Sequence, residues 1–305
     1  MYNMDKLYEA VEAKGHVCVG LDTAIDYIPE KERLRASSEA EAVLAYNRAV
    51  IDATLDAAAC YKVQIACYEE LGLAGLNAYA QTLKYLRGKG ALIIADIKRG
   101  DIADTARRYA RAHFQGDFEA DFVTISPYMG MDSVEPWLDW ADKNGKGAFV
   151  LMRTSNKGMK DFEYLELKDD AASVQRGQGS RRLYDAVGDK LSALAEQRKG
   201  RYGYGAFGAV VGCTEQDEAA AIRARRANLF FLIPGYGAQG GGAEDAALLL
   251  RQGNGGVVNA SRSILMAWSA AGLPTGGADN AFAAQAARKA AVEMRDAIRT
   301  AAAKR

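Results

Sequence analysis

A lysine lies between two aspartates in the segment Ala95–Ile102, which reads Ala-Asp-Ile-Lys-Arg-Gly-Asp-Ile. The apolar run Ala91–Ile94 precedes it and predicts a buried strand. Because side chains alternate along a strand, Asp96 and Lys98 point to the same side, near the strand's C-terminal end. Asp101 lies just beyond. An isolated Asp-x-Lys is more often a surface ion pair, but two carboxylates around one ammonium at a strand end favour a functional site.

Two more charged residues extend this pattern. Asp22 ends the first apolar run, and Lys62 lies near the start of the second. Lys62, Asp96, Lys98 and Asp101 therefore form a row of alternating charge, in which the flanking carboxylates keep each lysine protonated. A fixed ammonium that faces a developing carbanion stabilises it and can protonate it. The row predicts charge stabilisation at a carbon acid.

Three later segments supply polar groups for a ligand. Pro234–Gly242 is rich in glycine, so its backbone can approach an anion closely and offer N–H donors. Asn259–Ile264 contains Arg262, which could grip a phosphate. Arg153–Asn156 could contact the polar edge of a heterocycle, although it could equally be an ordinary polar turn. The first two segments indicate a phosphate site.

The order of apolar runs and helical stretches predicts the fold. Eight strand–helix units within about 250 residues are typical of a TIM (β/α)8 barrel, which keeps its active site at the C-terminal ends of the strands. A doubly wound open sheet is the alternative, but no G-x-G-x-x-G follows the first run. The predicted strands are Val17–Leu21, Tyr61–Ala66, Ala91–Ala95, Phe122–Ile125, Ala148–Met152, Ala206–Val211, Leu229–Ile233 and Gly256–Asn259.

The remaining segments form helices and two insertions in a single domain, 1–305. Thr23–Ser38 follows the first strand, and the polar stretch Gly158–Arg182 follows the fifth, where we predict a mobile lid or a helical excursion. The Ala-rich tail Asp279–Arg305 predicts a helix that packs outside the barrel or serves a subunit contact. The other predicted helices are Glu39–Ala59, Tyr68–Lys89, Ile102–Phe114, Ser133–Lys143 and Glu215–Arg226.

Composition narrows the class of protein. The 305 residues carry 39 basic and 39 acidic side chains, and this zero net charge argues against nucleic acid or an anionic membrane as the main partner. The N-terminus has no signal-peptide core, and no apolar run is long enough to span a membrane. We expect a soluble, cytoplasmic protein.

Cysteine and histidine are too sparse for a zinc site. The four cysteines form no C-x-x-C pair and lie in or beside apolar runs, so we expect buried, reduced thiols. There are two histidines, and His113, among Arg and Ala on a helix, is predicted to lie at the surface. With so little histidine, acid–base chemistry must rest on Lys, Asp or Glu. We expect neither a metal nor a cofactor.

These motifs together resemble the orotidine 5′-phosphate decarboxylase family. Asp96–Ile102 fits the D-x-K-x-x-D-I signature of that family. Pro234–Gly241 resembles its phosphate-gripping loop, and Asn259–Ile264 resembles its final phosphate motif. The resemblance covers nearly the whole chain. The length, the Arg153–Asn156 segment and the insertion after the fifth strand look like the longer bacterial subgroup, and the two insertions depart from the compact members of the family. The resemblance implies a homodimeric barrel that decarboxylates orotidine 5′-monophosphate to uridine 5′-monophosphate without a metal.

The resemblance also implies roles at the reacting carbon. Lys98 would stabilise the carbanion at pyrimidine C6 and deliver its proton. Asp96 would lie near the departing carboxylate, orient Lys98 and bond to Lys62. Asp101 and Thr105 would cross the dimer interface into the neighbouring subunit's site, where Asp101 completes the charge row and Thr105 contacts ribose.

Further residues would bind the rest of the nucleotide. Asp22 and Lys62 would bind the ribose hydroxyls, and Ser155 would contact the pyrimidine edge. Gln239 would bridge the glycine-rich loop and the phosphate. The phosphate itself would be held by Arg262 and by the amides of Gly241 and Gly242.

Three other classes of protein compete with this interpretation. A sugar-phosphate relative of the same barrel, such as a keto-gulonate phosphate decarboxylase or a hexulose phosphate synthase, would use magnesium. Gln239 and Ser155 favour the pyrimidine nucleotide instead. A non-catalytic nucleotide-binding protein would be expected to lose Lys98 or a carboxylate of the row, and a structural or nucleic-acid-binding protein finds no support in the neutral charge.

Overall fold

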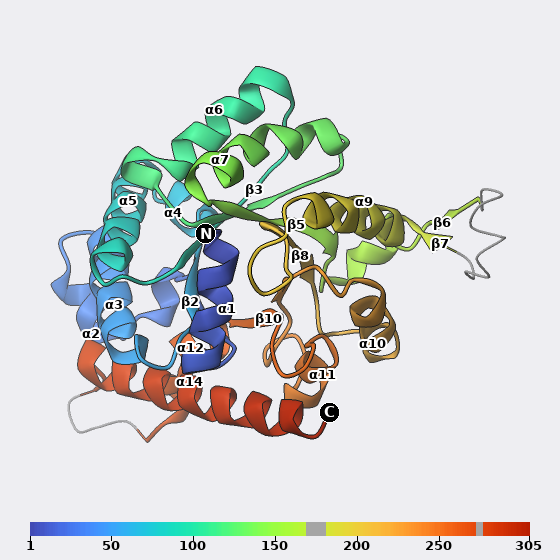
Figure 1. Ribbon diagram of the computed structural model, residues 1–305. Coiled ribbons are helices and arrows are strands. Elements are labelled where there is room, and N and C mark those ends of the chain that lie inside the picture. The colour runs from blue at the N-terminus through green and yellow to red at the C-terminus, as the bar shows by residue number, and fades with distance from the viewer. Residues whose placement is uncertain (169–180, 273–276) are drawn as a thin grey trace.

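The computed structural model describes residues 1–168, 181–272 and 277–305. Eight parallel strands close into a barrel in the order β1-β10-β9-β8-β5-β4-β3-β2, which confirms the predicted TIM barrel (Figure 1). β1 pairs with both β2 and β10, so the sheet has no free edge and the open-sheet alternative is wrong. The barrel strands are β1 Val17–Leu21, β2 Cys60–Gln64, β3 Ile93–Arg99, β4 Phe122–Ile125, β5 Gly147–Arg153, β8 Phe207–Val211, β9 Phe231–Ile233 and β10 Gly256–Ala260.

Helices cover the outside of the barrel. α14 (Asn280–Ala303) packs along α3 (Glu39–Thr54) and, as predicted for the tail, lies outside the barrel (Figure 1). Further long helices around the described barrel are α5 Gly72–Gly88, α6 Ala103–Phe114, α9 Leu183–Gln197 and α10 Gln216–Arg225. Shorter described helices include α4 Ala66–Glu69, α7 Leu138–Asn144, α11 Ala243–Leu248, α12 Arg262–Leu265 and α13 Ala267–Ala270, together with the 3-10 turns η2 Gly116–Phe118, η3 Met131–Ser133 and η4 Glu135–Trp137. None of the described helices is long and apolar enough to span a membrane.

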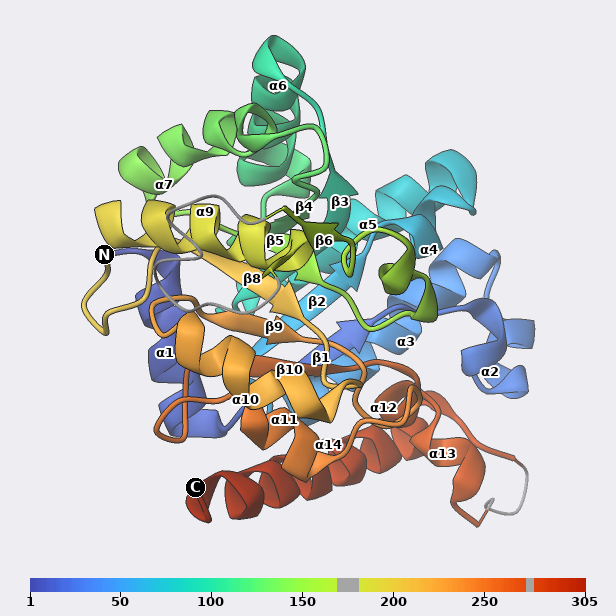
Figure 2. The same cartoon turned by 90° about the vertical axis from the view of Figure 1, so that its right-hand side faces the viewer.

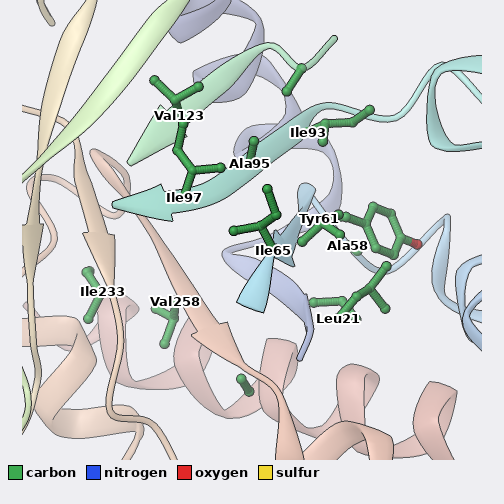
Figure 3. Close-up of a cluster of buried hydrophobic side chains, with 14 of the residues drawn as sticks. Leu21, Ala58, Tyr61, Ile65, Ile93, Ala95, Ile97, Val123, Ile233 and Val258 are labelled. Carbon is green, nitrogen blue, oxygen red and sulfur yellow. The ribbon is translucent and has the colours of Figure 1, made fainter. Parts of the chain in front are cut away.

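The strand alternation divides the core into two layers. Ile93, Ala95 and Ile97 of β3 lie in the layer between the strands and the outer helices (Figure 3). Ile94 points the other way, into the barrel, where it packs with Phe122 and with the equivalent residues of the other strands. The barrel interior is therefore filled by side chains at this level, as expected for eight strands.

An N-terminal helix that we did not predict closes the barrel at one end. α1 (Asn3–Lys14) presents Met4, Leu7 and Val11 to the inner layer, at the helical spacing of three and four residues. Figure 2 shows α1 at the end of the barrel opposite to α12 and α13. The N-terminal ends of the strands are thus covered, which leaves the C-terminal ends for a ligand.

Both predicted insertions begin at the C-terminal end of a barrel strand, β1 for the first and β5 for the second. The first forms the 3-10 turn η1 (Ile25–Tyr27) and the helix α2 (Glu30–Arg35). The second begins with the 3-10 turn η5 (Lys157–Asp161), followed by an antiparallel pair of short strands, β6 Glu166–Leu167 and β7 Arg181–Arg182, which project from the barrel in Figure 1. Residues 169–180, about half of the segment for which we predicted a lid, lie outside the described residues.

Three of the four cysteines are buried, as expected. The prediction that His113 lies at the surface is wrong. His113 is only 3% exposed, and its ring stacks on Phe118 with 6.0 Å between the ring centroids. Burial, followed by the nearby Arg99 guanidinium, lowers its pKa to about 4. The inner face of α6 consists of Ala106, Ala110, His113 and Phe114. The helical spacing of these residues therefore indicates that His113 is buried, although the charged residues around it in the sequence suggested exposure.

Candidate active site

Strand alternation positions a layer of polar residues directly above the apolar interior. Two residues beyond Cys60, Ile94 and Phe122 in their strands come Lys62, Asp96 and Thr124, which must also face inwards. These side chains form part of the wall of a cavity of about 510 Å³ at the C-terminal ends of the strands. The other lining residues are Asp22, Tyr27, Gln64, Lys98, Leu151, Thr154, Ser155, Asn156, Val210, Leu232, Pro234, Gly235, Tyr236, Ala238, Gln239, Asn259, Ser261 and Arg262.

Four charged residues form a continuous chain of ion pairs across this cavity. Lys62 Nζ lies 2.8 Å from Asp22 Oδ1 and 2.9 Å from Asp96 Oδ2. Lys98 Nζ lies 2.6 Å from Asp96 Oδ1. The side chains of Lys62 and Asp96 are almost fully buried, whereas that of Lys98 is 50% exposed. Lys98 therefore presents the ammonium group that a ligand in the cavity can reach.

The ion pairs fix the charge states of the two buried residues, Lys62 and Asp96. Burial by itself would raise the pKa of Asp96, but the ammonium groups of Lys62 and Lys98 hold it well below its usual range. Burial would likewise lower the pKa of Lys62, but Asp22 and Asp96 raise it above its usual value. The carboxylate between the two lysines is therefore ionised at neutral pH.

Two neutral side chains complete the surroundings of Asp96, and we did not predict either of them. Gln64 Nε2 donates to Asp96 Oδ2 at 3.1 Å, and Thr124 Oγ1 donates to Asp96 Oδ1 at 2.8 Å. Both lie two residues beyond an inward-facing residue of the same strand, Lys62 and Phe122 respectively. Counting alternate positions along neighbouring strands would have found them.

Asp22 is anchored from β10, the strand that pairs with β1 on the side away from β2. Ser261 Oγ, which follows β10, donates to Asp22 Oδ2 at 2.9 Å. Gly20 makes this approach possible, because a Cβ at its position would lie 2.0 Å from Ser261 Oγ. Asn259 Nδ2 lies 3.4 Å from the same hydroxyl. A glycine in the first strand thus leaves space for polar side chains of the last strand.

The segment after β5 contributes Ser155 to the cavity, together with its neighbours Thr154 and Asn156. Glu163 holds this segment: its carboxylate accepts hydrogen bonds from Thr154 N at 2.8 Å and from Thr154 Oγ1 at 2.7 Å. Burial raises the pKa of Glu163, although the hydrogen bonds from Thr154 oppose the shift. Sequence reasoning assigned no role inside this insertion and so missed Glu163.

The two predicted phosphate segments meet at one side of the cavity. Gln239 and the exposed Arg262 both line it. The glycine-rich loop turns at Gly235, whose φ of +102° is accessible to glycine but rare for other residues. Gly241 and Gly242 do not line the cavity in this structure: their amides donate to Gly235 O at 3.0 Å and to Asp245 Oδ2 at 2.7 Å.

Asp101 and Thr105 lie outside the cavity of the single chain. Asp101 is half-buried, and its carboxylate accepts a hydrogen bond from the adjacent Ile102 N at 2.8 Å. Thr105 is exposed on α6. The ion-pair chain therefore begins at Asp22 and ends at Lys98, and Asp101 does not extend it within this chain.

The donor set at the cavity favours ammonium groups over a metal ion. Each of the two cavity carboxylates, Asp22 and Asp96, already pairs with Lys62. Across residues 1–168, 181–272 and 277–305, no group of three or more His, Cys, Asp or Glu side chains is arranged to hold a metal ion. The arrangement can stabilise negative charge that develops beside Lys98.

Comparison with known proteins agrees with this geometry. The sequence profile of the orotidine 5′-phosphate decarboxylase / HUMPS family matches residues 15–271. An orotidine 5′-phosphate decarboxylase of Clostridium perfringens is 56% identical over 297 residues, covering 97% of this chain and 98% of its own, and that of Clostridium acetobutylicum is 52% identical over 296 residues, covering 97% and 98%. The solved structure of Leishmania donovani OMP decarboxylase is similar with a TM-score of 0.73 at 32% identity, covering 98% of this chain and all of that one. The chain therefore belongs to the orotidine 5′-phosphate decarboxylase family.

Proposed function

We propose that this protein is a carboxy-lyase that converts orotidine 5′-monophosphate to uridine 5′-monophosphate and CO2, the last step of de novo uridine 5′-monophosphate synthesis. The observation that carries the proposal is the ion-pair chain Asp22–Lys62–Asp96–Lys98, which ends at a half-exposed ammonium in the cavity of a chain 56% identical to a decarboxylase. A preorganised cation at this point stabilises the charge that decarboxylation creates.

In the proposed reaction the bond between pyrimidine C6 and its carboxylate breaks, and the electron pair remains on C6. The ammonium of Lys98 stabilises this carbanion and then transfers a proton to C6. Asp96 holds the Lys98 ammonium at 2.6 Å and lies beside the departing carboxylate. Since Lys62 and Asp96 are fixed by their own partners before the ligand binds, little reorganisation is needed during the reaction.

The rest of the cavity is proposed to bind the nucleotide. Asp22 and Lys62 contact the ribose hydroxyls, and Ser155 contacts the pyrimidine edge. Gln239 and Arg262 hold the phosphate, with further donors from Gly241 and Gly242 once the loop rearranges around the ligand. Binding energy from the phosphate, which is far from the reacting carbon, can then order the loops around the pyrimidine.

We also propose that the active unit is a cytoplasmic homodimer with shared sites, in which Asp101 and Thr105 reach the partner's cavity. Exposed apolar side chains support this interface. Ile102 is 39% exposed after β3, and Tyr128 and Met129 are 81% and 50% exposed after the neighbouring β4. Exposed large apolar side chains after two neighbouring strands are typical of a contact surface. Neither nucleic acid nor a membrane is proposed as a partner.

The decisive experiment follows the absorbance of orotidine 5′-monophosphate after the purified protein is added, with and without excess chelator. We expect rapid loss that the chelator does not change. Parallel assays contain magnesium and either keto-gulonate phosphate or the substrates of hexulose phosphate synthesis. No loss of orotidine 5′-monophosphate, together with turnover in a magnesium assay that stops when chelator is added, would transfer the assignment to the sugar-phosphate relatives.

A further inference from the structure

The backbone at Lys98 is strained and must be held by its surroundings. Its φ is +44°, a left-handed conformation that residues other than glycine seldom adopt. The pairing of β3 with β4 is also broken here, because Ala95 pairs with Val123 and Arg99 pairs with Ile125. Three residues of β3 therefore lie opposite a single residue of β4, which is Thr124. Such a bulge leaves backbone amides without their usual partners in the sheet.

The hydroxyl of Thr124 replaces those partners. Thr124 Oγ1 accepts hydrogen bonds from Ile97 N and from Lys98 N, each at 3.0 Å. A hydroxyl oxygen has two lone pairs and carries one proton. Since both lone pairs are occupied by the amides, the proton is available only for a third contact, which is Asp96 Oδ1 at 2.8 Å. Thr124 is 1% exposed, so water does not compete for these bonds.

The same carboxylate oxygen binds the other end of Lys98. Lys98 Nζ lies 2.6 Å from Asp96 Oδ1, the atom to which Thr124 donates. One hydroxyl thus fixes the backbone of Lys98 directly and fixes its ammonium through Asp96. Ile97 lies beside Val123 on the opposite face of the sheet, so its side chain packs away from the cavity (Figure 3). The bulge is held by apolar packing on one face and by Thr124 on the other.

We infer that Thr124 is a positioning residue for the decarboxylation, setting the orientation of both Asp96 and Lys98 without contacting the reacting atoms. This inference rests on the proposed function. Removing the hydroxyl leaves two buried amides and one carboxylate oxygen short of a partner. The bulge then relaxes and the Lys98 ammonium moves away from C6. The loss falls on the chemical step, because the groups proposed to bind ribose and phosphate lie on other strands and loops.

The test compares three substitutions of Thr124 in the full-length protein. Thr124→Val keeps the shape and removes the hydroxyl. Thr124→Ser and Thr124→Cys form a matched pair that both lack the methyl group, but the thiol is a far weaker hydrogen-bonding group than the hydroxyl. We expect kcat to fall about 10- to 100-fold in the valine variant, with the serine variant within about threefold of wild type and the cysteine variant well below serine. KM and the affinity for uridine 5′-monophosphate should change by less than about threefold.

Several outcomes would overturn the inference. The first is a valine variant that keeps nearly the kcat of wild type. The second is equal kcat in the serine and cysteine variants, and the third is a variant that loses as much nucleotide affinity as kcat. If the valine variant fails to fold, the comparison of kcat between the serine and cysteine variants tests the inference. Crystal structures of the variants give a readout that needs no turnover: the φ of Lys98 should leave the left-handed region in the cysteine or valine variant and stay there in the serine variant. Inactive wild type would refute the proposed function, whereas an unchanged Lys98 backbone would refute the role of Thr124.

Discussion

Lys98 Nζ and Asp96 Oδ1 lie 2.6 Å apart although the two residues are separated by a single residue on a broken strand. On a regular strand such a pair would share one face, with both side chains roughly perpendicular to the sheet. The left-handed backbone at Lys98 instead lets the ammonium turn back onto the carboxylate. The pair thus lies at the bulge, and its ammonium is held at the wall of the cavity.

Replacing Lys98 by alanine should abolish most turnover and spare product binding. Its ammonium acts on charge that exists only in the transition state, so kcat should fall by at least roughly 100- to 1,000-fold. The affinity for uridine 5′-monophosphate should stay within about threefold. Lys89→Ala, which removes a surface lysine paired with Asp52 at 2.7 Å, is the matched control and should leave both quantities unchanged. Equal activity of Lys98→Ala and wild type would contradict the assigned role.

Replacing Arg262 by alanine should weaken nucleotide binding through the phosphate alone. We expect the affinity for uridine 5′-monophosphate to fall by ~2–4 kcal/mol, the scale for losing one partner of a charged contact. Calorimetric titration measures it, and uridine, which has no phosphate, serves as the control ligand. If both ligands lose affinity equally, Arg262 supports the cavity in general and does not grip the phosphate.

Mixing two inactive variants tests the shared site. Asp101→Ala and Lys98→Ala subunits, each carrying a different affinity tag, should form heterodimers with one cavity that contains both native residues. That cavity should recover up to about half of the activity of a native dimer, since it is one of two sites. Tandem purification isolates the heterodimer, and each homodimer provides the baseline. Verified heterodimers without any recovered activity would contradict the sharing of sites between subunits.

His113 should make the fold less stable in mild acid. Its pKa falls from an ordinary 6.5 to about 4 through burial, followed by the effect of Arg99, so the folded state binds fewer protons than the unfolded state in this window. Its contribution to stability is therefore complete above pH 6.5 and is lost as the pH falls towards 4. The loss amounts to as much as about 3 kcal/mol. Urea unfolding of wild type and His113→Gln between pH 7 and 4 should show a smaller decline in the variant, whereas parallel curves would contradict the prediction.

Leu7 should contribute to stability without contributing to catalysis. It is fully buried on α1, at the end of the barrel opposite to the cavity. Leu7→Ala should lower the free energy of unfolding by about 2–5 kcal/mol through the lost contacts and the cavity left behind. At a temperature where the variant is folded, kcat/KM should remain that of wild type. Leu34→Ala, at a side chain 79% exposed, should change neither quantity. A large drop in kcat/KM for the Leu7 variant would show that the two ends of the barrel are coupled.

The sequence by itself determined the barrel and most of the cavity. Parallel strands buried on both faces require continuous apolar runs, and these runs marked all eight strands. Residues that follow such runs gather at one end of a barrel, so Asp22, Ser155, Gln239 and Arg262 could be assigned to one site before their distances were known. The D-x-K-x-x-D-I signature carried the family resemblance, which the family profile and the close relatives confirm.

Only the tertiary structure decided how the charged groups are held. The bulge in β3 depends on pairing with β4, and the support from Thr124 and Gln64 depends on which residues lie side by side across strands. The burial of His113 and the closing role of α1 likewise follow from packing against segments distant in the sequence. A local pattern specifies the type of element and its inward face, because both depend on neighbours in the chain. Register, bulges and hydrogen-bond partners depend on contacts between distant segments, so they are settled only when the barrel closes.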